Sequence, residues 1–555
     1  MGSNIPDIQP SFGSNASLRS SSAPTATVRN GTLRGVYSRQ YDQDFFLGIP
    51  YAQPPLNNLR FNLPQSLNSA WHGVKDAVEY SPECVGYGSD DVGYPSSEDC
   101  LTLNVIRPAG VKANADLPVV VWIHGGGFVE GGSADKRYNV SFIVQNSVEM
   151  NQPIIAVGIN YRLAGWGFLY SSTVASAGLG NIGLLDQRLA LHWIQENIAS
   201  FGGSPKKVTI WGESAGAMSV GAHLIAYGGR DDGLFRAAIA ESGGPNLFNI
   251  ESAVTAQAGY DNITQSTGCA TAADQLGCLR ALPFDTLNDI LNRTAGYFMP
   301  VIDGTFMETL PSKQLTSGAF VKVPFLIGAN SDEGTAFGEV GINTDAEFKA
   351  LVMSKGADAE TAEIMSYLYP DIPAIGIPAT LISPPTSTVL GLQYKRQAAF
   401  SGDWLMIGTR RASCESWSNY SVPAYCYRFN VLVAGLPAEI GSTHFQEVAF
   451  VFDNIHGYGY VLDAINPFTN EPPTYTKLAK IMSRMWVSFV VNLNPNKHGI
   501  PGVPSWPGYN INDGLGAQDM VFDANVSTLA YPERDTFRAE GIAFINEIAA
   551  TQFGR

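Results

Sequence analysis

The chain has 555 residues, of which 45% are hydrophobic and 15% charged, as expected for a well-packed globular protein with a large core. Its formal net charge of −16 argues against binding nucleic acid or an anionic membrane through a basic surface. The longest apolar stretches, 117–123 and 485–491, are too short to span a bilayer, so no membrane span is expected.

Residues 1–26 are rich in Ser, Pro, Ala and Asn and show little hydrophobic periodicity, which predicts a flexible N-terminal segment. Ordered structure is expected from about Thr27. The first residues lack the apolar region of a signal peptide, and we interpret this start as replacing a signal that has been removed.

Downstream, short apolar runs alternate with longer helical patterns, which predicts an α/β fold with a large, mostly parallel central sheet and helices on both faces. The runs interpreted as buried strands are 117–123, 153–159, 208–211, 237–241, 323–329 and 424–429. The helical patterns are 187–199, 217–226, 478–492 and a last amphipathic helix at 534–549. No internal repeat or linker divides the chain, so residues 27–555 are predicted to form a single domain.

Six cysteines fall by position into three close pairs, Cys84 with Cys100, Cys269 with Cys278, and Cys414 with Cys426. No C-x-x-C motif and no clustered histidines accompany them, so local disulfides are favoured over a metal site, although six cysteines formally allow fifteen pairings. Secretion is also indicated by seven candidate N-glycosylation sequons, at Asn15, Asn30, Asn139, Asn262, Asn292, Asn419 and Asn525.

The most informative motif is Gly-Glu-Ser-Ala-Gly at 212–216, between an apolar run and a helical pattern. A serine on a sharp strand-to-helix turn needs glycines on both sides, because side chains there would collide. Such a turn would expose the hydroxyl of Ser214. A five-residue pattern also arises by chance in ordinary turns, so a catalytic role requires a base, an acid and oxyanion donors elsewhere in the chain.

Oxyanion donors are predicted from the glycine run 125–127, which follows the strand 117–123. Successive glycines allow backbone N–H groups to point into a cavity, and a helix beginning at Ala215 supplies another N–H. The same run could form a simple loop. A phosphate loop is disfavoured because G-x-x-x-x-G-K-[ST] is missing from the sequence.

Seven histidines limit the search for the base, and the chain order Ser, acid, His leaves only His444, His456 and His498. Small residues precede His444, which gives its imidazole room to face a cleft. We interpret His498 as part of a solvated polar loop and His456 as a structural histidine and the second candidate for the base.

The acid is sought at the carboxyl end of a predicted strand, where catalytic groups of parallel sheets gather. Asp332 and Glu333 follow the strand 323–329, and Asp303 is a weaker third candidate. Chemistry alone does not separate the two adjacent carboxylic acids.

Several long motifs together resemble the type-B carboxylesterase/lipase family of the α/β-hydrolase fold, which includes cholinesterases and fungal lipases. Within that family we interpret the chain as a secreted fungal carboxylesterase. The matching segments are 46–55 (FLGIPYAQPP), 98–104 (EDCLTLN), 160–163 (NYRL), 180–187 (GNIGLLDQ) and Trp506-Pro507. The resemblance covers about 27–549 and implies one catalytic domain that needs no cofactor.

By this resemblance Ser214 is the nucleophile, Glu333 the acid and His444 the base. Gly126, Gly127 and Ala215 match the oxyanion-hole positions. The resemblance also implies the disulfides Cys84–Cys100 and Cys269–Cys278, whereas Cys414–Cys426 rests on spacing alone. Tyr297, Phe298 and Met299 fall where the family builds its acyl pocket, with core packing as an equal alternative.

One departure concerns the loop between Cys84 and Cys100, which in lipases of this family is a long amphipathic lid. Here the loop is short, acidic and poor in aliphatic residues, which disfavours activation on oil droplets. It also lacks the tryptophan with which cholinesterases hold a quaternary ammonium, so choline esters are disfavoured.

These features predict a secreted serine carboxylesterase whose partner is a small-molecule ester with a short or medium acyl chain. The first alternative is a lipase acting on longer-chain acylglycerols. The second is a catalytically inactive adhesion or interaction module, which the presence of Ser214, Glu333 and His444 argues against.

Overall fold

The structure is a computed structural model that describes residues 23–246, 253–294, 298–372, 389–460, 466–514 and 516–555. Most of the predicted flexible segment, residues 1–22, therefore lies outside the described residues. The first strand, β1 (Thr25–Val28), begins two positions before the expected Thr27.

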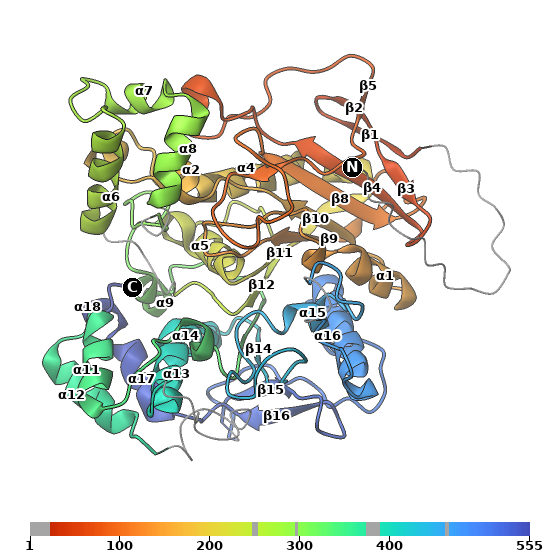
Figure 1. Cartoon of the computed structure of the whole chain (residues 1–555). Coiled ribbons are helices and arrows are strands. Elements are labelled where there is room, and N and C mark those ends of the chain that lie inside the picture. Colours follow the sequence, from red (N-terminus) through yellow and green to blue (C-terminus); the bar gives the residue numbers. More distant parts are fainter. Residues whose placement is uncertain (1–22, 247–252, 295–297, 373–388, 461–465, 515) are drawn as a thin grey trace.

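The centre of the fold is an eleven-stranded sheet, which confirms the expected large, mostly parallel sheet (Figure 1). Neighbouring strands from β10 to β15 pair in parallel, and the pairs toward both edges are antiparallel. The spatial order is β16 (Ala530–Arg534), β15 (Gln518–Phe522), β14 (Ala424–Phe429), β13 (Phe325–Asn330), β12 (Ala237–Glu241), β11 (Gly203–Glu213), β9 (Leu117–Ile123), β10 (Ile155–Ile159), β8 (Thr102–Pro108), β4 (Gln43–Pro50) and β3 (Val36–Ser38).

All six apolar runs interpreted as strands lie in the parallel part of this sheet. The bounds of three of them differ from the prediction. Strand β11 is longer than the run 208–211, because residues from Gly203 onward continue to pair with β9 across a register shift. Strand β10 begins at Ile155, and β13 runs from Phe325 to Asn330, one residue past the expected end.

Two small sheets flank the large one. Strand β1 pairs with β2 (Gly31–Arg34), which pairs with β5 (Val74–Asp76). Within the Cys84–Cys100 loop, β6 (Glu83–Cys84) pairs with β7 (Ser96–Ser97). The loop is therefore closed both by its disulfide and by a short backbone pairing.

Helices cover both faces of the central sheet. Side chains alternate along β9, so Val119 and Val121 contribute to one core and Val120 and Trp122 to the other. The first core contains residues of α4 (Ile182–Asn197) and α5 (Ala215–Gly229). The second contains residues of α1 (Ser141–Glu149), α15 (Val448–Val451) and α16 (Pro473–Asn492).

The remaining α-helices are mostly short. Helices α11, α12, α13 and α17 gather in a separate small core at one end of the molecule (Figure 1). Their bounds, with the others, are α2 (Ala164–Phe168), α3 (Ser172–Ser176), α6 (Ala253–Ser266), α7 (Gln275–Arg280), α8 (Phe284–Arg293), α9 (Pro311–Ser317), α10 (Gly334–Phe337), α11 (Asp345–Ser354), α12 (Ala359–Leu368), α13 (Tyr394–Gly402), α14 (Gly408–Asn419), α17 (Ala539–Glu547) and α18 (Ala549–Gln552).

The prediction of one continuous helix over 534–549 is wrong. Arg534 ends strand β16, opposite Gln518 of β15. The next residue, Asp535, is buried in ion pairs with Arg410 and Arg411, at 2.6 and 2.5 Å. The helix therefore starts only at α17, since these buried contacts hold the preceding segment in a non-helical path.

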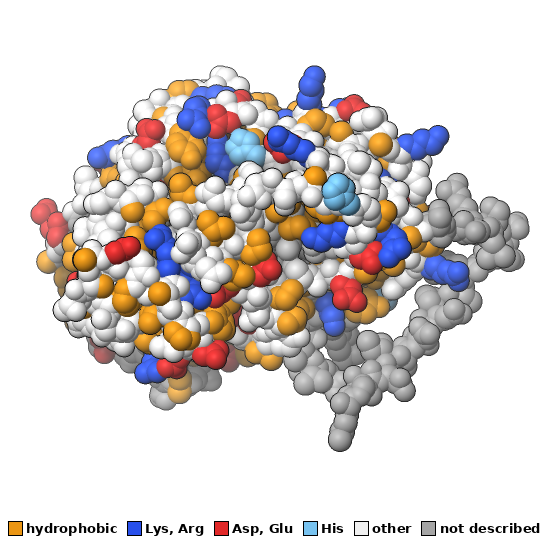
Figure 2. Space-filling model, turned by 90° about the horizontal axis from the view of Figure 1, so that it is seen from above, with side chains coloured by type: hydrophobic (Ala, Val, Ile, Leu, Met, Phe, Trp, Pro, Cys, Tyr) orange, Lys and Arg blue, Asp and Glu red, His pale blue; other side chains and the backbone are white. Residues whose placement is uncertain are grey.

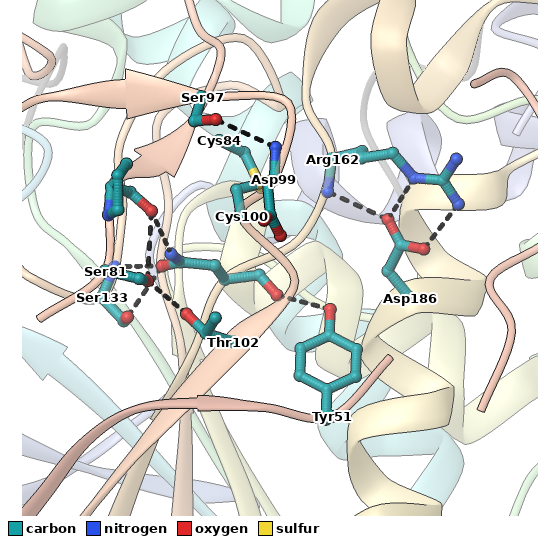
Figure 3. Close-up of a disulfide and its surroundings, with 12 residues drawn as sticks. Tyr51, Ser81, Cys84, Ser97, Asp99, Cys100, Thr102, Ser133, Arg162 and Asp186 are labelled. Atoms are coloured by element: carbon teal, nitrogen blue, oxygen red, sulfur yellow. Dashed lines mark hydrogen bonds and ion pairs between the residues drawn. A yellow bond between two sulfur atoms is a disulfide. The ribbon is translucent and has the colours of Figure 1, made fainter. Parts of the chain in front are cut away.

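The structure contains the three disulfides Cys84–Cys100, Cys269–Cys278 and Cys414–Cys426. The first lies close to the ion pair between Arg162 and Asp186, whose atoms are 2.7 Å apart (Figure 3). Arg162 and Asp186 belong to two of the sequence motifs quoted above, and their pairing ties the end of β10 to α4.

Charged groups are dispersed over the face seen in Figure 2, where Lys and Arg side chains are scattered among acidic, apolar and uncharged ones. Within the described ranges, no helix has the length and apolarity that a membrane crossing requires.

Candidate active site

Ser214 occupies the sharp turn between β11 and α5. Its backbone angles, φ 55° and ψ −122°, lie outside the usual regions for a residue with a side chain, so the turn is strained. The backbone N–H of Ser214 donates to the carbonyl of Glu241 at the end of β12, at 2.9 Å. This bond fixes the turn to the neighbouring strand and holds the strained conformation in place.

The flanking glycines are required by close packing. A Cβ on Gly216 would overlap the carbonyl oxygen of Ile123, and a Cβ on Gly212 would overlap the backbone of Gly216. The strand-to-helix turn therefore tolerates no side chain at either position.

His444, in the loop between β14 and α15, contacts Glu333, which lies three residues after the end of β13. Nδ1 of His444 lies 2.7 Å from Oε2 of Glu333. The other carboxylate oxygen of Glu333 accepts hydrogen bonds from the hydroxyl of Ser242 at 2.5 Å and the backbone N–H of Asn330 at 2.7 Å. Glu333 is fully buried, so its orientation toward His444 is fixed by these three contacts.

The opposite ring nitrogen of His444 faces Glu213, the residue that precedes Ser214. Nε2 of His444 lies 3.2 Å from Oε1 of Glu213. A Cβ added to Gly125 would lie 2.9 Å from Oε2 of Glu213 and 3.1 Å from Cβ of Ser214. Ser214, His444 and the glycine loop thus gather around Glu213, although none of the described hydrogen bonds joins Ser214 directly to His444.

The pKa values of His444 and Glu213 are both raised by their surroundings. Burial alone would lower the pKa of His444, but the carboxyl groups of Glu213 and Glu333 raise it to about 9. Burial raises the pKa of Glu213 well above its usual range. Both groups therefore hold their protons to higher pH than they would in water.

A further carboxyl group, Glu447, extends the site. Its oxygens accept hydrogen bonds from Ser242 at 3.1 Å and from the side chain of Asn330 at 2.6 Å. Burial and the charge of Glu333 raise the pKa of Glu447 to about 7. Ser242 and Asn330 each contact both Glu333 and Glu447, so the two glutamates are held as one hydrogen-bonded unit.

The glycine loop after β9 has the geometry of a donor loop. Gly126 and Gly127 have φ angles of 90° and 61°, which side chains rarely adopt. Their N–H groups take part in none of the backbone hydrogen bonds found among the described residues. Ala215 begins α5, where the first N–H groups of a helix lack intrahelical acceptors.

The three candidate acids have different hydrogen-bond partners in the structure. Asp332 accepts a hydrogen bond from the backbone N–H of Ser442 at 2.8 Å, and burial raises the pKa of Asp332 to about 8. Asp303 accepts from the side chain of Asn181 at 2.9 Å. Of the three predicted candidates, Glu333 is the one in contact with His444.

The alternative histidines lie in other environments. His456 makes a ring contact with Tyr458. The interpretation of His498 as solvated is wrong, because only 5% of its surface is exposed. Its Nδ1 accepts the backbone N–H of Ile500, which folds the polar turn back over the imidazole.

The predicted acyl-pocket residues are only partly described, since Tyr297 lies outside the described residues. Phe298 and Met299 are buried in the core that contains α4 and α5. The candidate sequons differ in exposure. Asn30 and Asn139 are half-buried and Asn15 lies outside the described residues, while four are exposed: Asn262, Asn292, Asn419 and Asn525.

The sequence analysis missed Glu213, Ser242, Asn330 and Glu447 as parts of the site. Glu213 lies inside the pentapeptide, and Glu447 follows His444 by three positions, so both were near a recognised motif. No spacing rule connects Ser242 to Glu333, because the contact arises only when β12 and β13 pair side by side.

The sequence is similar to those of known carboxylesterases and lipases. The sequence model of the carboxylesterase family matches residues 22–521. Lipase 2 of Diutina rugosa is 34% identical over 93% of this chain and 95% of its own length. Secreted lipase 1 of Botryotinia fuckeliana is 32% identical over 88% of each chain.

Solved structures of esterases also resemble this chain in fold. The crystal structure of Aspergillus niger EstA matches with a TM-score of 0.82 and 28% identity, covering 96% of this chain and 99% of that one. The structure titled PNB esterase matches with a TM-score of 0.75 and 27% identity, covering 94% and 100%.

The sheet order and the serine turn, together with these neighbours, define an α/β-hydrolase. The chain belongs to the carboxylesterase family and is a carboxylic ester hydrolase.

Proposed function

We propose that this protein is a serine carboxylesterase that works through an acyl-enzyme, with Ser214 as nucleophile, His444 as base and Glu333 as the residue that orients the base. The observation that carries the proposal is the 2.7 Å contact between Nδ1 of His444 and Glu333, next to the strained turn of Ser214. A carboxylate at Nδ1 fixes the tautomer in which Nε2 can accept a proton.

In this mechanism the hydroxyl of Ser214 attacks the ester carbonyl while Nε2 of His444 takes its proton. The N–H groups of Gly126, Gly127 and Ala215 stabilise the negative charge that develops on the carbonyl oxygen. His444 then gives its proton to the departing alcohol, and water hydrolyses the acyl-enzyme with His444 again as base.

The first experiment uses Ser214→Ala, which we expect to lose about three to six orders of magnitude in kcat, as removal of a triad nucleophile does elsewhere. An organophosphate should add its mass to the wild-type peptide that contains Ser214 and leave the variant unmodified. Retained esterase activity in a folded variant, or no mass shift in the wild type, would contradict the proposal and favour an inactive module.

We further propose a preference for short to medium acyl chains, supported by how firmly the Cys84–Cys100 loop is attached. The loop carboxylates of Asp90 and Asp91 contact the segment after β9, Asp90 through Arg137 at 2.7 Å and Asp91 through the N–H of Gly131 at 2.8 Å. Tyr87 donates to the side chain of Asn288 at 2.8 Å. A loop held on two sides is unsuited to the large opening that a lipid droplet triggers in a lidded lipase.

A lipase remains the second candidate, because the relatives quoted above are named lipases. A series of nitrophenyl esters from acetate to palmitate, together with a triglyceride emulsion, separates the two. We expect the highest kcat/KM at short or medium chains and no rise in rate when droplets form. A rate that jumps at the solubility limit of the triglyceride would favour the lipase.

Residues 27–555 are proposed to form one catalytic domain, because β3 and β16, from opposite ends of the chain, are the two edges of one sheet. Secretion is proposed from the three disulfides and from the relatives named as secreted. The exposed sequons Asn262, Asn292, Asn419 and Asn525 are the proposed glycan sites.

A further inference from the structure

The Cys84–Cys100 loop is hydrogen-bonded to the segment 129–131, which comes directly after the glycine loop 125–127 and Phe128. Each of the three residues in this segment takes part in such a bond. The bonds run from the N–H of Tyr87 to the carbonyl of Val129 at 2.7 Å, from the N–H of Asp90 to Oε2 of Glu130 at 2.8 Å, and from the N–H of Gly131 to Oδ1 of Asp91 at 2.8 Å. The Cys84–Cys100 loop therefore holds the chain that leads out of the glycine loop at three consecutive positions.

The same segment also closes the turn of the glycine loop. The carbonyl of Gly126 accepts the N–H groups of Val129 and Glu130, at 3.0 and 3.1 Å. A Cβ on Gly126 would overlap the carbonyl oxygen of Glu130, so the turn is closely packed. In the Cys84–Cys100 loop, a Cβ on Gly86 would lie 2.8 Å from the carbonyl oxygen of Val129 and 3.0 Å from Cα of Glu130. The loop thus packs against the turn so closely that Gly86 has no room for a side chain.

Three successive residues at this turn have left-handed backbone angles. Gly126, Gly127 and Phe128 have φ angles of 90°, 61° and 63°. Phe128 carries a side chain, so its positive φ is unfavourable and persists only where surrounding contacts hold it. Its side chain is fully buried, and its carbonyl accepts the N–H of Ala164 at 2.7 Å. The next three residues, 129–131, are held by the Cys84–Cys100 loop.

The directions of the Gly126 and Gly127 N–H groups depend on these backbone angles. An oxyanion donor must lie about 2.7–3.1 Å from the charged oxygen, and catalytic groups tolerate shifts of only about 0.5 Å. Without the contacts between residues 129–131 and the Cys84–Cys100 loop, the turn would relax and the two N–H groups would turn away. These contacts therefore bear on the chemical step as well as on stability.

We propose that the Cys84–Cys100 loop positions the oxyanion donors, and that Asp91 and Glu130 are the positioning residues. Their side chains accept two of the three bonds that join the loop to the segment 129–131, so each bond is removable by a side-chain substitution. The inference rests on the proposed function, because it takes Gly126 and Gly127 as oxyanion donors. It gives the loop a part in the chemical step, which is separate from the chain-length preference proposed above.

The test compares two ketone inhibitors of the same shape. When a trifluoromethyl ketone binds, the oxygen of Ser214 adds to the ketone carbon, the serine proton passes to His444, and the negative charge stays on the former carbonyl oxygen. The corresponding methyl ketone occupies the site without this addition. The ratio of the two inhibition constants therefore measures the stabilisation of the oxyanion apart from the binding of the ground state.

Removal of one oxyanion donor elsewhere costs about a hundredfold or more in kcat, and a displaced donor should cost less. Asp91→Ala and Glu130→Ala should each weaken the trifluoromethyl ketone about tenfold or more and the methyl ketone less than about twofold. For nitrophenyl acetate, kcat should fall with little change in KM. Asp91→Asn keeps an acceptor for the N–H of Gly131 and should restore most of the loss. Asp99→Ala removes an exposed carboxylate of the same loop, next to Cys100 (Figure 3), and is the matched control.

The ketone ratio also separates this inference from the proposed function. If the wild type prefers the trifluoromethyl ketone and Ser214→Ala does not, the nucleophile is correctly assigned. An unchanged ratio in folded Asp91→Ala and Glu130→Ala, even with a lower Tm, would then overturn the positioning role alone, as would equal weakening of both ketones. If the wild type shows no preference between the ketones, the nucleophile is wrongly assigned and this inference fails with it.

Discussion

Nε2 of His444 lies 3.2 Å from Oε1 of Glu213, the residue immediately before the proposed nucleophile. In the proposed mechanism, a protonated His444 must lose its proton before it can accept one from Ser214. We therefore expect the contact between these two residues to influence the pH range of activity.

Replacing Glu213 by Gln should move the acid limb of kcat/KM to lower pH. The carboxyl groups of Glu213 and Glu333 raise the pKa of His444 to about 9, so without Glu213 the imidazole becomes neutral at lower pH. The measurement is the hydrolysis of a soluble ester between pH 5 and pH 10. Glu540→Gln, on the exposed side of α17, is the control, and an unshifted limb in Glu213→Gln would argue against the coupling.

Replacing Asp332 or Glu333 by the corresponding amide should have very different effects on kcat. Glu333→Gln removes the charge that orients His444, and we expect kcat to fall by about 10⁴, as the comparable change does in other triads. Asp332→Asn retains an acceptor for the N–H of Ser442 and should change kcat by less than about tenfold. Similar losses in both variants would show that the acid is wrongly assigned.

Ser242 should act as a positioning residue. Its hydroxyl donates to Glu333 at 2.5 Å, and hydrogen bonds to charged groups contribute about 1.5–3 kcal/mol, so Ser242→Ala should lower kcat roughly tenfold to a hundredfold. KM should stay nearly constant, and the pH limb of His444 should shift because Glu333 is less well fixed. A loss of stability with an unchanged pH profile would indicate a purely structural role.

Thermal stability should be highest in mild acid and fall toward alkaline pH. Burial raises the pKa of Asp332 and of Glu83 to about 8 each. A folded-state pKa above the unfolded value contributes stability below the unfolded pKa, near pH 4, and this contribution is lost as pH rises toward 8. We expect Tm to fall over this range, and less steeply in Asp332→Asn. A Tm that rises steadily from pH 5 to pH 8 would contradict this assignment.

The sequence by itself determined the fold class, the serine turn and the chain order of the triad candidates. These are local properties: the buried strands are short apolar runs, and the glycines at 212 and 216 are imposed by a turn within five residues. The last helix was predicted too long because the burial of Asp535 against Arg410 and Arg411 is a tertiary contact.

The family resemblance pointed to Glu333 rather than Asp332, but only the tertiary structure showed its contact with His444 and the other side chains that surround the two. Glu333, Ser242 and His444 follow three separate strands, and their contacts exist because β12, β13 and β14 lie side by side in the sheet. Glu213 lies inside the motif that the sequence singled out. Its effect on the pKa of His444 depends on a 3.2 Å contact between residues more than two hundred positions apart.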